Sequence, residues 1–190
     1  TRTRWLLAGA GAAAVFVVVY ISFMGYAGDR VTAWLHPELD PGDTGYQILQ
    51  SLYAIGSGGL FGLGYGKSRQ KYLYLPFQYN DYIFAVICEE LGMVGAMAIV
   101  ALFAVTILRG YWIALNARDR FSTVLAAGLV TLIAVQTILN LCVVTNLLPS
   151  TGIALPFFSY GGTALAVNLG EMGIVLGISR GRNRRKIQEA

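Results

Sequence analysis

The chain has 190 residues, of which 56% are hydrophobic and only 13% charged, and its formal net charge is +4. In soluble globular domains about a quarter of the residues are charged, so this composition excludes an ordinary soluble protein and indicates one embedded in a membrane. The basic balance does not require a nucleic-acid partner, because anionic lipid headgroups attract a basic segment such as residues 180–186.

Four apolar stretches are long enough to cross a hydrocarbon core, which takes roughly 20 helical residues. They cover about residues 5–27, 82–108, 121–148 and 160–179, and no charged residue occurs between Phe121 and Gly170. The sequence therefore predicts an all-α, polytopic transmembrane helix bundle with about four spanning helices, organised as one domain over residues 1–190.

The distribution of basic residues predicts the orientation of these helices. Most of the 14 Lys and Arg residues lie near the two ends of the chain or between residues 109 and 120. By the positive-inside rule these segments, and with them both termini, are predicted to be cytoplasmic. The long loop between residues 28 and 80 and the loop at residues 149–159 are then predicted to face outward.

The long outward loop carries signals of membrane-surface helices and of anion binding. Ile48, Leu49, Leu52 and Ile55 recur at helical spacing, which suits a helix that lies on the membrane. Farther along the loop, three cations alternate with polar residues: Lys67, Arg69 and Lys71. They suit either a lipid pyrophosphate or general attraction to lipid headgroups, and the sequence leaves both open.

The glycines between residues 56 and 66 do not form a nucleotide loop. A phosphate-binding loop would need glycine where Phe61 stands, and no strand and helix flank the segment in the required order. The glycines are instead predicted to permit tight turns or a close approach of two backbones.

Charged and polar residues within the apolar stretches are candidates for function. Glu89, Glu90 and Glu171 would be costly at membrane depth unless they face a bundle interior or a cavity. A role in the site and a role in helix packing are both open for them. Gln136 and Asn140 are four residues apart and are predicted to join helices by hydrogen bonds.

Cysteine and histidine usage limits the chemistry. Cys88 and Cys142 both fall in apolar stretches, so buried thiols are expected rather than a disulfide, and no metal site is predicted. His36 is the single histidine of the chain, which excludes a catalytic pair of histidines.

A series of short motifs follows one another along the chain. They are Asp40-Pro41, Gly45-Tyr46-Gln47, Gln50-Ser51, Gly58-Gly59-Leu60, Leu75-Pro76, Asp81-Tyr82-Ile83-Phe84-Ala85, Glu89-Glu90-Leu91-Gly92, and the segment from Leu148-Pro149 to Ser159-Tyr160-Gly161-Gly162. With these motifs in this order, the chain resembles the carboxy-terminal part of the SEDS family of bacterial cell-wall polymerases, typified by FtsW, RodA and SpoVE. The stretch from Gly64 to Lys71 resembles the division and sporulation branches, FtsW and SpoVE, more than the elongation branch.

The resemblance implies a peptidoglycan glycosyltransferase that polymerises lipid II at the outer face of the bacterial cytoplasmic membrane. The catalytic aspartate of the family falls on Asp40, which would act as general base on the attacking sugar hydroxyl. The residues expected to contact substrate are Lys67, Arg69, Lys71, Asp81, Glu89, Glu90, Ser159 and Tyr160. Because the leaving group is already a pyrophosphate, no nucleotide cofactor is expected, whereas a divalent cation is left open.

The resemblance also implies partners, and the chain differs from the family pattern at a few positions. Expected partners are lipid II, undecaprenyl pyrophosphate, membrane lipid, a class B penicillin-binding protein and other division proteins, with no nucleic acid. Phe77 stands where the family commonly has a glutamate, and Tyr79-Asn80 replaces the usual residues before the Asp81 motif. These differences affect the roles assigned to this part of the loop and leave the role of Asp40 untouched.

Two other function classes compete with the enzyme. A lipid II flippase would need a continuous polar track across the spans, and the sequence supplies only Glu89, Glu90 and Glu171 for one. A non-catalytic division scaffold would not need Asp40. An outward, membrane-lying loop that carries Asp40 favours the enzyme.

Overall fold

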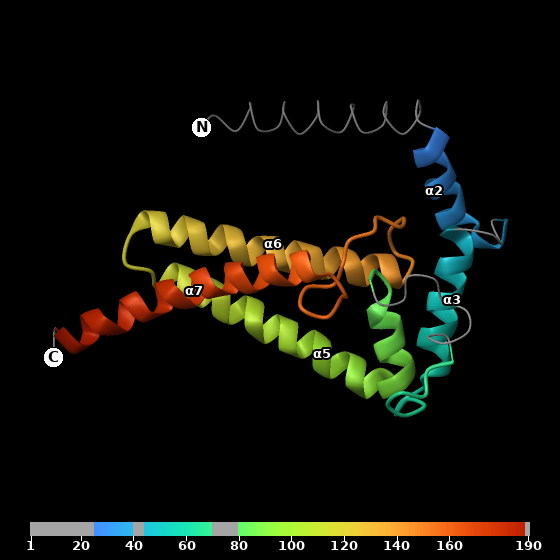
Figure 1. The fold of residues 1–190 in the computed structure, drawn as a ribbon, viewed down its shortest axis with the longest axis horizontal. Helices are drawn as coiled ribbons and strands as arrows, with labels where there is room; N and C mark the ends of the chain where they lie inside the picture. Colours follow the sequence, from blue (N-terminus) through green and yellow to red (C-terminus); the bar gives the residue numbers. More distant parts are fainter. Residues whose placement is uncertain (1–24, 40–43, 70–79, 189–190) are drawn as a thin grey trace. The chain divides into compact units, whose positions relative to one another are not determined.

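The computed structural model describes residues 25–39, 44–69 and 80–188. Its elements are α2 (Gly25–Leu35), the short 3-10 helix η1 (Pro37–Leu39), α3 (Thr44–Ser57), α5 (Ile83–Leu115), α6 (Arg120–Val144) and α7 (Gly162–Gln188). Every element in these ranges is helical and none is a strand, so the all-α prediction is confirmed (Figure 1).

The chain divides into two compact units, Thr1–Leu49 and Gln50–Ala190. Within the first unit, the amide of His36 makes the last bond of α2, to the carbonyl of Thr32 at 2.8 Å, and η1 follows with the amide of Leu39 bonded to the carbonyl of His36 at 3.0 Å. The second unit contains the end of α3, the loop that follows it and the three long helices.

In the second unit, α5, α6 and α7 pack side by side (Figure 1). Buried apolar side chains from all three helices meet, including Ala114 of α5, Val130 of α6 and Val175 of α7. The outer faces remain apolar as well, with Leu108, Leu132 and Val167 more than 45% exposed. A helix that is apolar all round suits a lipid environment or the core of a larger bundle.

Three helices of the described part are long and apolar enough to cross a membrane: Ile83–Leu115, Arg120–Val144 and Gly162–Gly181, with mean hydropathies of 2.5, 2.1 and 1.3. They correspond to the predicted stretches 82–108, 121–148 and 160–179, although the first helix continues farther and the second ends earlier. The predicted span at 5–27 lies outside the described residues, apart from its last three, which begin α2.

The early end of α6 has a local cause. Asn146 adopts a positive φ of 58°, which stops the helix. The amide of Leu147 then donates to the carbonyl of Cys142 at 2.7 Å, and the amide of Asn146 donates to the carbonyl of Val143 at 3.0 Å. This is the Schellman arrangement, in which a residue in the left-handed region satisfies the last carbonyls of a helix. Asn146 thus ends a helix that hydropathy alone would continue.

Helix α5 is broken inside. Gly92 has φ 68° and ψ −170°, so Ile83–Leu91 and Met93–Leu115 are two helical segments. Figure 1 shows them meeting at a sharp angle. The short first segment carries Glu89 and Glu90, and the long second segment packs against α6.

Candidate functional site

The break in α5 is held by the glycine-containing loop that follows α3. The amides of Leu63 and Gly64 donate to the carbonyls of Glu89 and Glu90 at 2.9 and 3.0 Å. These carbonyls end the first helical segment and would otherwise lack partners. Irregular backbone at membrane depth is tolerated only where protein or a wet cavity satisfies it, and here a loop of the same chain does so.

The same loop also satisfies the start of the second helical segment. The amides of Met93 and Val94 donate to the carbonyls of Gly59 and Leu60 at 2.9 and 3.2 Å. The loop therefore donates hydrogen bonds to carbonyls before the break and accepts hydrogen bonds from amides after it. The loop and the break form one hydrogen-bonded unit.

This pairing requires glycine on both sides. Gly62 and Gly92 both have positive φ, of 75° and 68°. A Cβ atom on Gly62 would lie within 2.6 Å of the backbone nitrogen of Gly92, and one on Gly92 would lie 2.6 Å from the carbonyl oxygen of Leu60. The prediction that the glycines between residues 56 and 66 permit a close approach of two backbones is confirmed at Gly62, and Gly92 on the other side was not foreseen.

The carboxylate of Glu89 is buried beneath the end of this loop. Only 1% of Glu89 is exposed. One carboxylate oxygen accepts a hydrogen bond from the hydroxyl of Ser68, which is itself 2% exposed. The other accepts from the backbone amide of Arg69 at 3.0 Å. Glu89 thus binds the cationic segment of its own chain.

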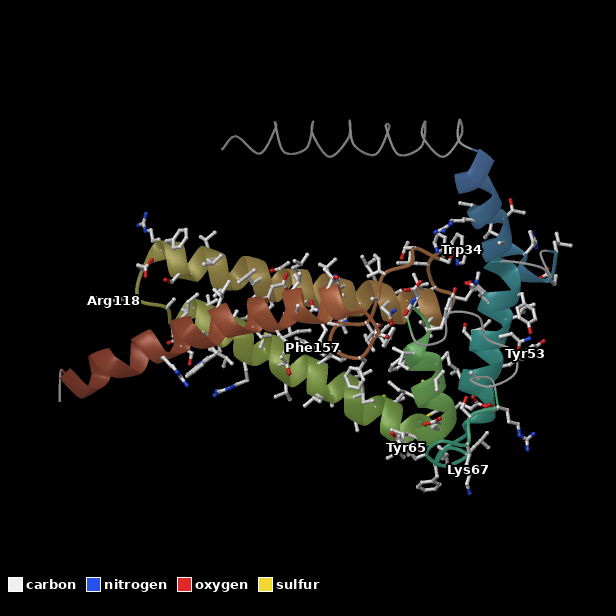
Figure 2. The ribbon with its side chains drawn as sticks, in the orientation of Figure 1. Trp34, Tyr53, Tyr65, Lys67, Arg118 and Phe157 are labelled. Carbon is white, nitrogen blue, oxygen red and sulfur yellow. The ribbon has the colours of Figure 1, made fainter. Side chains whose placement is uncertain are left out.

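The cations of that segment lie at the surface. Lys67 and Arg69 are both exposed, and Figure 2 shows Lys67 and Tyr65 pointing away from the helices at the tip of the loop. Arg118 lies in the loop between α5 and α6, at the opposite end of the helices (Figure 2). The two loops therefore lie at opposite ends of the three-helix unit.

An apolar pocket of about 420 Å³ adjoins the loop. Its lining residues come from the end of α3, the loop and both sides of the break: Ile55, Gly56, Gly59, Leu60, Cys88, Met93 and Ala96. The hydrogen bonds between Gly59 and Met93 and between Leu60 and Val94 form part of its frame. The structure therefore places an apolar pocket and exposed cations on one loop.

A second polar centre lies where α6 meets the segments before α5 and before α7. The side-chain amide of Asn140 donates to the backbone carbonyls of Asp81 and Ile153, both at 2.8 Å. The sequence predicted that Asn140 joins helices, whereas it joins α6 to two irregular segments. Its position in an uncharged, apolar run was the signal of a buried role.

The predicted site residues that the structure describes are spread over the loop after α3, the segment from Asp81 to Glu90 and the segment before α7. Asp40 and Lys71 lie outside the described residues. Glu90 is buried next to Glu89, and Asp81 is half-buried near Asn140. In the segment before α7, the hydroxyl of Ser159 accepts from the amide of Leu155 at 2.7 Å and closes a turn, whereas Tyr160 is 84% exposed.

Metal and thiol chemistry receive no support from the described residues. In that part of the chain no group of three or more His, Cys, Asp or Glu side chains could hold a metal ion. Cys88 is buried and Cys142 half-buried, and both are free thiols.

The sequence of the whole chain places it in a family. The model of the FtsW, RodA and SpoVE family, described as cell cycle proteins, matches residues 1–184. The chain belongs to this family. Among its relatives, stage V sporulation protein E of Bacillus subtilis is 50% identical over 151 residues, which are 80% of this chain and 41% of that protein. The probable peptidoglycan glycosyltransferase FtsW of Trichlorobacter lovleyi is 44% identical over 181 residues, which are 95% of this chain and 48% of that protein.

Solved structures of the FtsW, RodA and SpoVE family agree with this membership. A chain from a structure described as a peptidoglycan synthase complex that coordinates polymerization and crosslinking matches with a TM-score of 0.75 and 30% identity, over 94% of this chain and 49% of that one. A variant of the rod shape determining protein RodA from Thermus thermophilus matches with a TM-score of 0.55 and 32% identity, over 70% of this chain and 40% of that one. The polytopic membrane fold is shared, and the chain spans about half the length of the relatives it matches.

Proposed function

We propose that this chain is the carboxy-terminal part of a peptidoglycan glycosyltransferase that polymerises lipid II at the outer face of the bacterial cytoplasmic membrane, in cell division or sporulation. Membership of the FtsW, RodA and SpoVE family carries the proposal, since a relative that is 44% identical is named a probable peptidoglycan glycosyltransferase. The likeness to a chain of a peptidoglycan synthase complex supports a penicillin-binding protein as partner.

The chemistry of the loop after α3 is consistent with a substrate that has a lipid tail and a pyrophosphate. Exposed Lys67 and Arg69 supply positive charge, and the adjoining pocket at Leu60 and Met93 is apolar. Cations placed at a departing pyrophosphate stabilise the charge that develops there. Lys71 is proposed to add to this charge, and an isoprenoid chain would lie against the apolar surface.

Asp40 is the proposed general base. The acceptor hydroxyl must lose a proton as it attacks the anomeric carbon, and a carboxylate near the headgroups can accept that proton. A second carboxylate acting as acid is not needed, because the pyrophosphate leaves without protonation. The loop that carries Asp40 is proposed to face outward, with the end near Arg118 in the cytoplasm.

The test is polymerisation of lipid II by the full-length protein together with its penicillin-binding partner in proteoliposomes. Asp40→Asn keeps the size of the side chain and removes its basicity, so we expect a loss of about 10²- to 10⁴-fold in rate. Glu38→Gln is the matched control, because the Glu38 side chain is exposed. Its one ion pair among the described residues is with His36, at 3.4 Å. Asp43→Asn is a second control.

Both controls should retain most of the activity and partner binding. A parent-like rate for Asp40→Asn would refute the general-base assignment. A flippase would respond differently, since transport along the spans should be most sensitive at buried Glu171 and insensitive at Asp40. Loss of lipid II flipping in Glu171→Gln with normal polymerisation in Asp40→Asn would therefore favour the transporter over the enzyme.

A further inference from the structure

Residues 67–69 alternate between surface and interior. Lys67 and Arg69 are exposed, whereas Ser68 between them is only 2% exposed. Ser68 is therefore directed inward, whereas the two cations on either side of it lie at the surface. Figure 2 shows the outward direction for Lys67.

Glu89 holds Ser68 in this inward position. Its carboxylate accepts from the Ser68 hydroxyl with one oxygen and from the Arg69 amide with the other. Two bonds to successive residues fix both the position and the rotation of the segment, as one bond would not. Glu89 and Ser68 are both buried, so water does not compete freely for the bond between them, and the bond from the Arg69 amide is partly buried.

Glu89 also holds the other end of the same segment. Its backbone carbonyl accepts from the amide of Leu63 at 2.9 Å. Between the two attachment points the chain turns, with the amide of Lys67 bonded to the carbonyl of Gly64 at 3.1 Å. One residue of α5 therefore fixes residues 63–69 at both ends.

We propose that Glu89 is a positioning residue, which presents Lys67 and Arg69 as a preformed pair of cations for the pyrophosphate of a polyprenyl lipid without touching that ligand. Both oxygens of its carboxylate are engaged by the loop, and a negative side chain in contact with pyrophosphate would repel it. Long cationic side chains lose entropy when a ligand orders them, and a fixed backbone reduces that cost. The identity of the lipid rests on the proposed function, whereas the positioning itself does not.

The experiment is a double-mutant cycle on binding, with the full-length protein in nanodiscs and farnesyl pyrophosphate as the probe. Farnesol and inorganic pyrophosphate separate the contribution of the chain from that of the anion. We expect Lys67→Ala with Arg69→Ala to remove the preference for farnesyl pyrophosphate over farnesol. Glu89→Gln should weaken binding by about 3- to 10-fold, the effect of roughly one hydrogen bond.

The decisive result is the coupling between the two changes. If Glu89 acts through the cations, Glu89→Gln should have no further effect on binding once Lys67 and Arg69 are alanine. An equal loss in both backgrounds would overturn the proposal, because Glu89 would then act on the ligand or on the fold independently of the cations. An unchanged affinity in Glu89→Gln alone would overturn it as well.

A second variant covers the case in which Glu89→Gln fails to fold. Ser68→Ala removes one of the two bonds to the carboxylate and should show the same coupling. Ser57→Ala is its matched control, since the Ser57 hydroxyl bonds the carbonyl of Ala54 in its own helix turn. Coupled binding without polymerisation of lipid II by the parent protein would support the positioning role and refute the proposed function. Polymerisation of lipid II by the parent protein together with uncoupled binding would support the proposed function and refute the positioning role.

Discussion

The side-chain amide of Asn140 donates a hydrogen bond of 2.8 Å to the backbone carbonyl of Asp81, although the two residues are 59 positions apart in the chain. The same amide donates to Ile153, also at 2.8 Å. Asn140 is 1% exposed and both acceptor residues are half-buried, so the two bonds are partly shielded from solvent. One side chain in α6 therefore fixes the segment that enters α5 and the segment that leads to α7.

We expect Asn140→Ala to destabilise the protein. The substitution leaves the carbonyls of two half-buried residues without their amide donor, and we expect a cost up to that of a buried acceptor that loses its partner, about 1–3 kcal/mol. Asn116→Ala is the matched control, since the side-chain amide of Asn116 bonds the carbonyl of Trp112 in its own turn and is exposed. Thermal unfolding of the purified protein in detergent measures both; equal midpoints for the two variants would contradict the role of Asn140.

We expect Gly92→Ala to be more harmful than Gly128→Ala. At Gly92 a Cβ atom meets backbone atoms of the loop and φ is positive, so overpacking and backbone strain each cost about 1–3 kcal/mol. At Gly128, inside α6, a Cβ atom meets nothing within 4 Å, and alanine favours a helix by up to about 1 kcal/mol. The unfolding midpoint should fall for the first variant and stay or rise for the second. A harmless Gly92→Ala would mean that the loop does not pair with the break.

We expect the two ends of the three-helix unit to be labelled from opposite sides of the membrane. In a background with Cys88→Ala and Cys142→Ala, a cysteine at exposed Tyr65 should react with an impermeant thiol reagent outside intact cells, whereas one at Arg118 should react only after permeabilisation. Figure 2 places these two residues at opposite ends. Reversed labelling would overturn the proposed orientation and, with it, a site at the outer face.

We expect Asp119 to make the start of α6 sensitive to acid. The Ser122 amide donates to its carboxylate at 3.0 Å and the Ser122 hydroxyl at 2.8 Å, and these bonds lower the pKa of Asp119 below its ordinary value of 3.8. A carboxylate with a lowered pKa stabilises the fold above pH 3.8, and that contribution is lost as the pH falls through the folded pKa.

Asp119→Asn provides the matched comparison, because asparagine can still cap the helix but does not titrate in this range. Unfolding midpoints measured from pH 7 down to pH 3 should fall more steeply for the parent protein than for this variant. Parallel curves would show that Asp119 contributes nothing to the acid sensitivity. Asp119→Ala, which removes the cap, should lower the midpoint at pH 7 already.

Hydropathy and charge counts were sufficient for the membrane class, the all-α fold and the approximate helices from residue 82 onward. These features follow from local composition, because about 20 apolar residues in succession are what a bilayer requires of a helix. The ordered motifs from Asp40 to Gly162 were likewise sufficient for the family, since they are read directly from the chain. The role of Asp40 stays a prediction from the sequence, since residues 40–43 lie outside the described residues.

The tertiary structure alone decided how these parts are held together. The sequence presented residues 82–108 as one apolar stretch, yet α5 breaks at Gly92, because the loop with Gly59 and Leu60 supplies the partners that an unbroken helix would find within itself. The hydrogen-bond partners of the Glu89 carboxylate, the Ser68 hydroxyl and the Arg69 amide, could not be read from the sequence. Hydrogen-bond partners far apart in the chain are chosen by packing in three dimensions, and no local pattern of residues specifies them.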